Sequence, residues 1–278
     1  MYLNFLFVPT LLGALLLFVV GFRLAAVVRS PARLAAMLVL AGAMALPALL
    51  FVAYYGRVLD RAAWFYSFRA ASYSELAASG LGLGAGLLVG LLQRRWGSAQ
   101  SRVRFRLVAS GVGVLCLVVL AVPYIKPVIA PIRRPLHDQW SEGVCLQSSS
   151  STCGPCSAST LLKQFNIAVS ERDLARECFS YRGGTENWYV ARALRQHGVK
   201  ANYLITSPEP ATLPIPAMAG VQMGGVRWGG HFITILGRKG DSYIIGDPLV
   251  GRLVLTPQQL RSRYYFTGFF LVVSRAKP

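Results

Sequence analysis

A cysteine, Cys153, follows five consecutive serine and threonine residues and leads into a predicted helix. A thiol at the N-terminus of a helix lies at the positive end of the helix dipole and loses its proton more easily. Gly154 comes next and lets the backbone approach closely beside the thiol. Gln147, six residues before the cysteine, carries a side-chain amide that can donate a hydrogen bond to an oxyanion. These residue types predict a nucleophile with an oxyanion-binding group beside it.

A histidine and an aspartate later in the chain have the spacing expected of neighbouring strands. His231 follows two glycines and begins an apolar stretch, and Asp247 ends the next stretch sixteen residues later. A hairpin of that length places the carboxylate beside the imidazole. Cysteine, histidine and aspartate then have the types of a nucleophile, a general base and a residue that orients the base. Each of them alone is more often structural, so the hypothesis depends on their combination.

Short elements surround these residues and predict an α+β domain with an antiparallel sheet, because helices come first and strands later. Three predicted helices cover residues 157–165, 170–178 and 186–197. The predicted strands cover residues 201–205, 217–222, 231–236, 243–245, 253–255 and 269–273. The sequence contains no phosphate loop of the GxxxxGK(S/T) type, so nucleotide hydrolysis within these residues is not expected.

The combined pattern resembles the C39 cysteine peptidases, papain-like domains that cut leader peptides after a Gly-Gly pair during bacteriocin export. The resemblance rests on a glutamine six residues before Cys-Gly, a Gly-His-Phe strand, and an Asp-Pro pair sixteen residues after the histidine. Gly184-Thr185, residues 193–199 and Leu213-Pro214 also fit, and the resemblance covers residues 143–275.

This resemblance implies a papain-like fold and peptide hydrolysis through an acyl-enzyme intermediate, with a peptide or protein as the substrate. It implies no metal and no organic cofactor. Because members of the family often belong to ABC exporters, a separate transporter is a further possible partner. The resemblance assigns the roles of nucleophile, base, orienting residue and oxyanion donor, in this order, to Cys153, His231, Asp247 and Gln147.

Two alternative functions remain open on the sequence. Cys153-Gly-Pro-Cys156 also matches the dithiol motif of thioredoxin-like oxidoreductases, in which the second thiol resolves a mixed disulfide. Such a motif should follow a buried strand in a βαβ unit, whereas here it follows serine and threonine residues. In the other alternative, the domain is a catalytically silent papain-like module that binds peptides. Two departures from the C39 pattern are Thr152, where an acidic residue is usual, and Cys156, where a small residue is common.

The remaining cysteines of the second half of the chain are most simply structural. Cys145, Cys156 and Cys178 allow three different disulfide pairings if the domain is oxidised. A zinc site is not expected, because the single CxxC pair has no well-spaced second pair.

The first half of the chain has the composition of a membrane region. Residues 1–135 hold 14 Lys and Arg but 2 Asp and Glu, and the whole chain is 54% hydrophobic. Four uncharged apolar stretches cover residues 3–22, 34–54, 76–92 and 107–125, close to the roughly 20 residues that cross a bilayer. The net charge of +18 does not indicate nucleic acid, because basic residues lie between the apolar stretches, as in membrane proteins. The sequence therefore predicts that this half of the chain lies in a lipid bilayer.

Three glycines in the third stretch indicate how the helices pack. Gly82, Gly86 and Gly90 repeat every four residues and so share one helix face. Such a face allows a second membrane helix to approach closely. The predicted parts of the chain are a transmembrane region, 1–126, a proline-rich linker, 127–142, and a C39-like domain, 143–278.

The distribution of basic residues predicts the orientation in the membrane. With the N-terminus outside, the inner flanks of the four helices carry eight basic residues and the outer flanks carry six. The uncharged start of the chain and the dense basic segment at residues 94–106 favour the same orientation. Four crossings then place the C-terminal domain outside. The sequence thus predicts a multi-pass protein of a bacterial inner or plasma membrane, with an extracytoplasmic peptidase domain.

Overall fold

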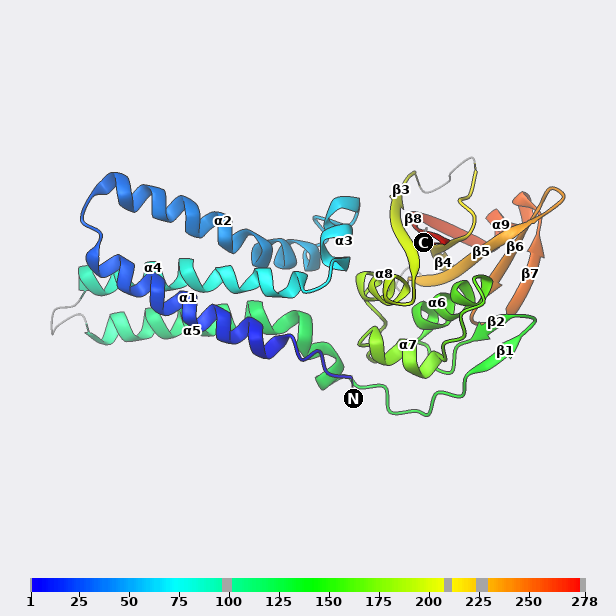
Figure 1. Cartoon of the computed structure of the whole chain (residues 1–278), viewed down its shortest axis with the longest axis horizontal. Helices are drawn as coiled ribbons and strands as arrows, with labels where there is room; N and C mark the ends of the chain where they lie inside the picture. Colours follow the sequence, from blue (N-terminus) through cyan, green and yellow to red (C-terminus); the bar gives the residue numbers. More distant parts are fainter. Residues whose placement is uncertain (1, 97–101, 208–211, 224–229, 276–278) are drawn as a thin grey trace. The chain divides into compact units, whose positions relative to one another are not determined.

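The structure, a computed structural model, describes residues 2–96, 102–207, 212–223 and 230–275. The chain divides into two compact units (Figure 1). The helical unit consists of Asn4–Asp60 and Tyr73–Ile125. The C-terminal unit consists of Met1–Leu3, Arg61–Ser72 and Lys126–Pro278.

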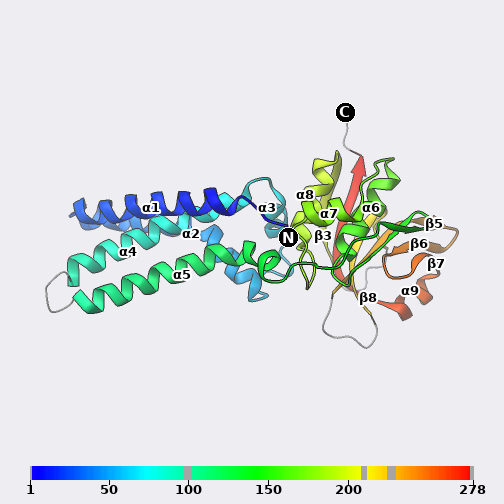
Figure 2. The same cartoon turned by 90° about the horizontal axis from the view of Figure 1, so that it is seen from below.

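The helical unit contains the predicted long apolar helices. They are α1 (Phe7–Val27), α2 (Pro31–Tyr55), the 3₁₀ helix η1 (Ser74–Gly80) continued by α4 (Leu81–Trp96), and α5 (Arg102–Ile129). Both Figure 1 and Figure 2 show them lying side by side along their length. Among the described residues, four helical stretches are long and apolar enough to cross a membrane, which is the predicted number. The first helix starts four residues later than predicted, because the Asn4 carboxamide accepts a hydrogen bond from the Leu6 N–H in a turn before it.

The predicted glycine face of α4 packs against α1. A methyl group added at Gly82 would collide with the carbonyl oxygen of Ala14, and one added at Gly86 would collide with that of Phe18. At Gly90 the added carbon would lie 2.6 Å from the Cβ of Ala25. The two backbones therefore approach as closely as glycine allows, and the prediction of a closely packed helix is confirmed.

The C-terminal unit is built on a six-stranded sheet in which every pair of neighbours is antiparallel, as predicted. The strand order is β3-β8-β4-β5-β6-β7. The strands are β3 (Val199–Ile205), β4 (Ala217–Met223), β5 (His231–Lys239), β6 (Ser242–Asp247), β7 (Gly251–Leu255) and β8 (Tyr264–Arg275). A separate hairpin of two short strands, β1 (Gln139–Ser141) and β2 (Val144–Leu146), precedes them.

Helices cover this sheet, three of the following four by direct contact and the other through its neighbours. They are α6 (Cys153–Gln164), α7 (Glu171–Glu177), α8 (Asn187–Gln196) and α9 (Pro257–Arg263). Helix α6 packs against β5 and α8 against β3, whereas α9 contacts β7 and β8, and α7 packs on α6 and α8. A cluster of buried side chains from β4, β5, β6, β8 and α9 forms one core, with Ile233, Ile235 and Phe270 fully buried in it. This core fixes the relative positions of the strands that carry the predicted site.

A further helix, α3 (Ala63–Ala70), joins the C-terminal unit from between α2 and η1. The guanidinium group of Arg192 on α8 donates to the carbonyl oxygens of Arg69 and Ala71, at 2.8 and 3.0 Å. The ring of Phe65 lies 6.4 Å from the ring of the buried Trp188. The segment 61–72, which the sequence places inside the transmembrane region, therefore packs as part of the C-terminal unit.

The close packing of α1 and α4 makes a testable prediction. Gly86→Ala should lower the stability of the helical unit by about 1–3 kcal/mol, because the new methyl group needs the backbones to separate. Gly111→Ala on α5 is the matched control, since an added Cβ there meets nothing within 4 Å and alanine favours a helix. Unfolding of the detergent-solubilised full chain measures both effects. A Gly86→Ala protein as stable as the control would contradict this packing.

Candidate active site

The predicted nucleophile, Cys153, is the first residue of α6, and 8% of its surface is exposed. The first helical hydrogen bond runs from the Cys156 N–H to the Thr152 carbonyl oxygen, at 3.0 Å. The N–H groups of Cys153 and Gly154 precede this bond and have no acceptor within the helix. The Cys153 thiol therefore lies beside backbone N–H groups that are not used within the helix.

The carbonyl oxygen of Ser149 fixes the loop before the nucleophile. It accepts hydrogen bonds from the Gln147 amide, at 2.9 Å, and from the backbone N–H and hydroxyl of Thr152, at 3.1 and 3.0 Å. The Thr152 hydroxyl in turn accepts from the Ser149 N–H, at 3.3 Å. Thr152, the departure from the C39 pattern, thus closes the turn that ends at Cys153.

Helix α6 is held against the strand that carries the predicted base. The Ser157 hydroxyl donates to the Phe232 carbonyl oxygen, at 3.2 Å, one residue after His231. A side chain at Gly154 would meet Val190, Thr185 and Phe232 within 3.7 Å, so the first turn of the helix fits closely between its neighbours. Small residues after the cysteine therefore let it come near the histidine.

The structure brings His231 and Asp247 together on neighbouring strands. Thr234 pairs with Gly246, and continuing this register sets Asp247 opposite Ile233, diagonal to His231 on the same side of the sheet. The His231 Nε2 lies 2.8 Å from the Asp247 Oδ1. The Cys153 thiol lies close enough to the imidazole to raise its pKa, and Nδ1 is the ring nitrogen that Asp247 does not use. The predicted cysteine, histidine and aspartate therefore form one chain of contacts.

The Asp247 carboxylate has two further partners, neither of which was predicted from the sequence. The Tyr264 hydroxyl donates to Oδ2, at 2.5 Å, and the Leu249 N–H donates to Oδ1, at 2.9 Å. Tyr264 is the first residue of β8 and is buried. No local motif marks this tyrosine, because its contact with Asp247 depends on the whole sheet. These donors compensate for the complete burial of the carboxylate.

The same contacts shift the pKa values of the pair. Burial alone would lower the pKa of His231, but hydrogen bonds with Asp247 and Cys153 outweigh it and raise the pKa from 6.5 to about 9. Burial would raise the pKa of Asp247, but hydrogen bonds from His231, Tyr264 and the Leu249 N–H lower it overall. Asp247 therefore stays ionised at neutral pH and can stabilise an imidazolium.

Gln147, the predicted oxyanion donor, lies beside the same strand end. Its backbone N–H donates to the carbonyl oxygen of Pro248, the residue after Asp247, at 2.9 Å. Its side-chain amide donates one hydrogen to the Ser149 carbonyl oxygen, and the amide nitrogen has a second hydrogen to donate. Its Oε1 is buried and has no hydrogen-bond partner among the described residues. Gln147 is therefore anchored next to the catalytic candidates through its backbone.

Cys156 has surroundings quite unlike those of Cys153. It is fully buried, and burial together with its hydrogen bond to Cys145 raises the pKa of its thiol well above the ordinary value. Cys178 is buried as well, and all five cysteines are free thiols. The sheet around them is antiparallel, whereas the dithiol motif of a thioredoxin needs a parallel βαβ unit. These observations argue against the redox alternative.

Metal ligation has no support within the described part of the chain. No group of three or more His, Cys, Asp and Glu side chains there could hold a metal ion.

The fold and this arrangement of side chains are those of an α+β domain in which a cysteine lies near a hydrogen-bonded pair of histidine and aspartate. The family model of the Peptidase C39 family matches residues 141–278. The C-terminal part of this chain therefore belongs to the Peptidase C39 family, as the sequence resemblance predicted.

Two archaeal proteins are similar to this part of the chain. One is an uncharacterised protein of Methanothermobacter marburgensis, 27% identical over 136 residues, which cover 48% of this chain and 89% of the relative. The other, from Methanothermobacter thermautotrophicus, is 27% identical over 134 residues with the same shares.

Solved structures similar to the C-terminal part of the chain include peptidase and C39-like domains of other proteins. A double glycine motif protease from an AMS/PCAT transporter, in complex with a leader peptide, is 23% identical, covering 53% of this chain and 99% of its own, with a TM-score of 0.40. The peptidase domain of Streptococcus ComA, a bifunctional ABC transporter of a quorum-sensing pathway, is 19% identical, covering 48% and 96%, with a TM-score of 0.40. The C39-like domain of a toxin secretion ATP-binding protein from Vibrio parahaemolyticus is 15% identical, covering 45% and 97%, with a TM-score of 0.35.

The raised pKa of His231 can be measured without any substrate. Nuclear magnetic resonance of histidine-labelled protein, with the resonance assigned through His231→Gln, should show an imidazolium that loses its proton near pH 9. Asp247→Asn should bring this pKa down toward 6.5, because it removes the negative charge that favours the charged ring. Asp241→Asn, at the exposed turn of the same hairpin, should leave it unchanged. A wild-type His231 that titrates near 6.5 would contradict the geometry of the pair.

Proposed function

We propose that this chain is a membrane-anchored cysteine peptidase that hydrolyses peptide bonds with Cys153, His231 and Asp247. The observation that carries the proposal is the position of the imidazole between the Cys153 thiol and the Asp247 carboxylate, in a domain of the Peptidase C39 family. These contacts match the roles of nucleophile, general base and orienting residue.

In the first half of the reaction, the proton shared by the Cys153 thiol and His231 lies on the imidazole, as the raised pKa of that ring favours, and the sulfur attacks the carbonyl carbon of the scissile bond. A carbon–sulfur bond forms, and the carbonyl electrons move to the oxygen. The amide of Gln147 and the N–H groups at the start of α6 are the available donors for this oxyanion. When the intermediate collapses, the carbon–nitrogen bond breaks and the imidazolium gives its proton to the leaving amine.

In the second half, His231 takes a proton from a water molecule, and the resulting hydroxide attacks the acyl carbon. The carbon–sulfur bond then breaks, which yields the carboxylic acid product and returns the sulfur. Asp247 holds the imidazole through Nε2 in both halves, so that Nδ1 remains directed to the sulfur and the leaving group. The buried hydroxyl of Tyr264 fixes the carboxylate from its other oxygen and acts as a positioning residue.

We further propose that the bond cleaved follows small residues such as a Gly-Gly pair. Cys153 and His231 each expose only 8% of their surface. Glycine, which has no side chain, is the residue that is easiest to place beside such buried groups. The solved relative bound to a leader peptide carries a double glycine motif in its name, which agrees with this substrate class.

The two cysteines of the Cys-Gly-Pro-Cys motif test the mechanism. Cys153→Ser should abolish peptide hydrolysis and labelling by a thiol-reactive peptide electrophile, because this is the cysteine that lies near the imidazole among the described residues. Cys156→Ser is the matched control and should keep most of the activity, since its thiol is buried against Cys145. Turnover of quenched Gly-Gly peptides by the full chain in detergent measures both.

Other outcomes would support the alternatives. If both single variants lost a disulfide reductase activity and the wild type cleaved no peptide, the protein would be a dithiol oxidoreductase. If the wild type bound peptides without cleaving them and without reacting at Cys153, it would be a silent peptide-binding module. Wild-type turnover in a folded His231→Ala protein would also end the peptidase assignment.

The helical unit supports a multi-pass anchor. The four candidate spans hold 21, 25, 23 and 28 residues, sufficient for a hydrocarbon core of about 30 Å. The C-terminal unit combines a segment between the second and third spans with the chain after the fourth. The third and fourth spans lie between these two parts of the chain, and two crossings return the chain to the side from which it started. Both parts of the C-terminal unit must therefore lie on the same side of the membrane. The excess of basic residues in the segment 94–106, on the opposite side, supports an extracytoplasmic position for the C-terminal unit. A separate transporter is a candidate partner.

The orientation can be tested with reporter fusions. An alkaline phosphatase fused after the C-terminus should be active, because this reporter enzyme becomes active only outside the cytoplasm. A cytoplasmic reporter at the same point should stay inactive. The reverse pattern would place the C-terminal domain in the cytoplasm.

A further inference from the structure

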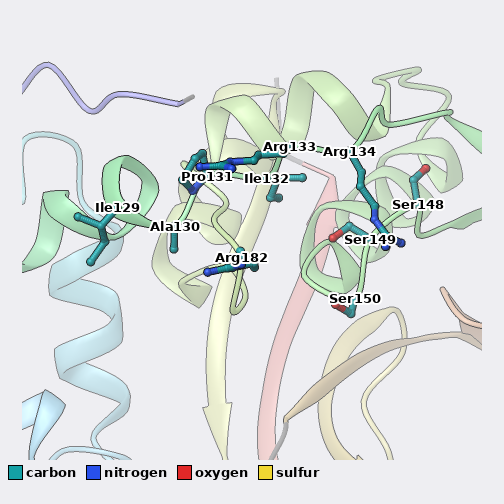
Figure 3. A pocket seen from close by; sticks show the side chains of 10 residues that line it. All are labelled: Ile129, Ala130, Pro131, Ile132, Arg133, Arg134, Ser148, Ser149, Ser150 and Arg182. Carbon is teal, nitrogen blue, oxygen red and sulfur yellow. The ribbon is translucent and has the colours of Figure 1, made fainter.

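A cavity of about 720 Å³ lies in the C-terminal unit between the linker after α5 and the loop before the nucleophile. Three arginines and three serines form its polar lining (Figure 3): Arg133, Arg134, Arg182, Ser148, Ser149 and Ser150. Figure 3 shows the Arg134 side chain extending toward the serine loop. No carboxylate occurs among the described residues that line the cavity. Its charge is therefore strongly positive.

The walls of this cavity are tied together by hydrogen bonds. The Arg182 N–H donates to the Ala130 carbonyl oxygen, at 2.6 Å, and joins the turn after α7 to the linker. The Gly183 N–H donates to the Ser151 hydroxyl, at 3.0 Å, and joins the same turn to the loop before Cys153. The backbone that carries the arginines is thus fixed relative to the nucleophile.

Two acidic residues of the C-terminal unit are already bound to groups other than these arginines. Glu171 is fully buried and accepts hydrogen bonds from the N–H and the hydroxyl of Ser148, at 2.8 and 2.6 Å. Glu186 is bound to Lys126, at 2.5 Å. Within the described part of the chain, none of the three guanidinium groups forms an ion pair. An anion that entered the cavity would meet arginine forks without a competing carboxylate.

The cavity also lies within reach of the scissile bond. Ser150 is three residues from Cys153, so their Cα atoms are at most about 11 Å apart. The carbonyl oxygen of Ser149, in the same wall, holds the amide of Gln147. An extended peptide advances about 3.3 Å per residue, so a side chain about two to four residues from the cleaved bond can reach this wall.

From this arrangement we propose that the cavity binds an acidic side chain of the substrate, carried about two to four residues from the bond that Cys153 attacks. The inference rests on the proposed peptidase function and adds a specificity determinant to it. A carboxylate suits the site because arginine binds carboxylates through two parallel hydrogen bonds. An acidic peptide is favoured over an anionic lipid headgroup, because half of the polar lining comes from the loop that ends at the nucleophile.

The test compares matched peptides on the full chain in phosphatidylcholine nanodiscs. Quenched peptides with a central Gly-Gly pair carry one Glu, or one Gln, at each position up to four residues on either side of the bond. At one or more positions, Glu should raise kcat/KM about tenfold or more over Gln. The ratio should fall as NaCl is added, because the exposed arginines are screened.

Arginine variants assign this preference to the cavity. The triple variant Arg133→Gln, Arg134→Gln and Arg182→Gln should bring the Glu-to-Gln ratio close to one. A control variant with the same change in net charge alters three exposed arginines elsewhere and should keep the Glu-to-Gln ratio. Its substitutions are Arg252→Gln, Arg261→Gln and Arg275→Gln. Arg134→Glu should reverse the preference in favour of Lys-bearing peptides, which loss of folding cannot do. A ratio of one in the wild type, or a ratio that survives the cavity variant, would overturn the inference.

Binding measurements separate this inference from the peptidase proposal. If the wild type cleaves no peptide, the peptidase proposal fails, and fluorescence anisotropy of labelled Glu and Gln peptides on the Cys153→Ala chain then tests the cavity alone. Tenfold tighter binding of the Glu peptide would support the cavity, and equal binding would overturn it. If the triple variant changed peptide binding or cleavage only in nanodiscs that contain phosphatidylglycerol, the cavity would be assigned to lipid headgroups instead.

Discussion

The hydrogen bond between His231 Nε2 and Asp247 Oδ1 needs a larger part of the C-terminal unit than the two residues themselves. A fully buried carboxylate is costly unless donors surround it, and here the donors come from three places in the chain. His231 is at the start of β5, Leu249 is in the turn after β6, and Tyr264 is at the start of β8, which is not a neighbour of β6 in the sheet. The sheet must therefore be complete before the pair is satisfied. In return, the pair gives the imidazole a fixed orientation with Nδ1 left for the sulfur.

A single carbonyl oxygen, that of Ser149, has a comparable role on the other side of the site. It holds the Gln147 amide and both donors of Thr152, and so sets the turn from which α6 starts. The same loop forms one wall of the basic cavity. The carbonyl oxygen that holds Gln147 and the serines that line the cavity thus belong to one short segment. In the proposed function, substrate binding in the cavity and chemistry at Cys153 would therefore take place a few residues apart.

Much of this site could be predicted from local spacing. Cys153, His231 and Asp247 lie in segments whose order and hairpin length already indicated contact, and the glycine face of α4 followed from a repeat of four. The start of α6 was predicted four residues late, because Gly-Pro in Cys153-Gly-Pro-Cys156 is typical of a loop, whereas proline is tolerated in a first turn. Strands β1 and β2 hold three residues each, too few for an alternating pattern to show. Tyr264 gave no signal at all, since its partner is determined by the tertiary fold.

Helix α3 shows most clearly why domain limits drawn from sequence can miss a folding unit. Its eight residues lie between apolar stretches, and nothing in their pattern relates them to a domain that begins some 70 residues later. In the structure, Tyr66 packs on the rings of Tyr203 and Phe269, and the arginines of α8 bind the carbonyl groups at the end of the helix. Without α3, these rings from β3 and β8 and the buried guanidinium group of Arg192 would lose partners that they have in the full chain. The C-terminal domain is thus completed by a segment that the chain supplies between two of its long apolar helices, so the folding of this domain depends on residues outside its own stretch of sequence.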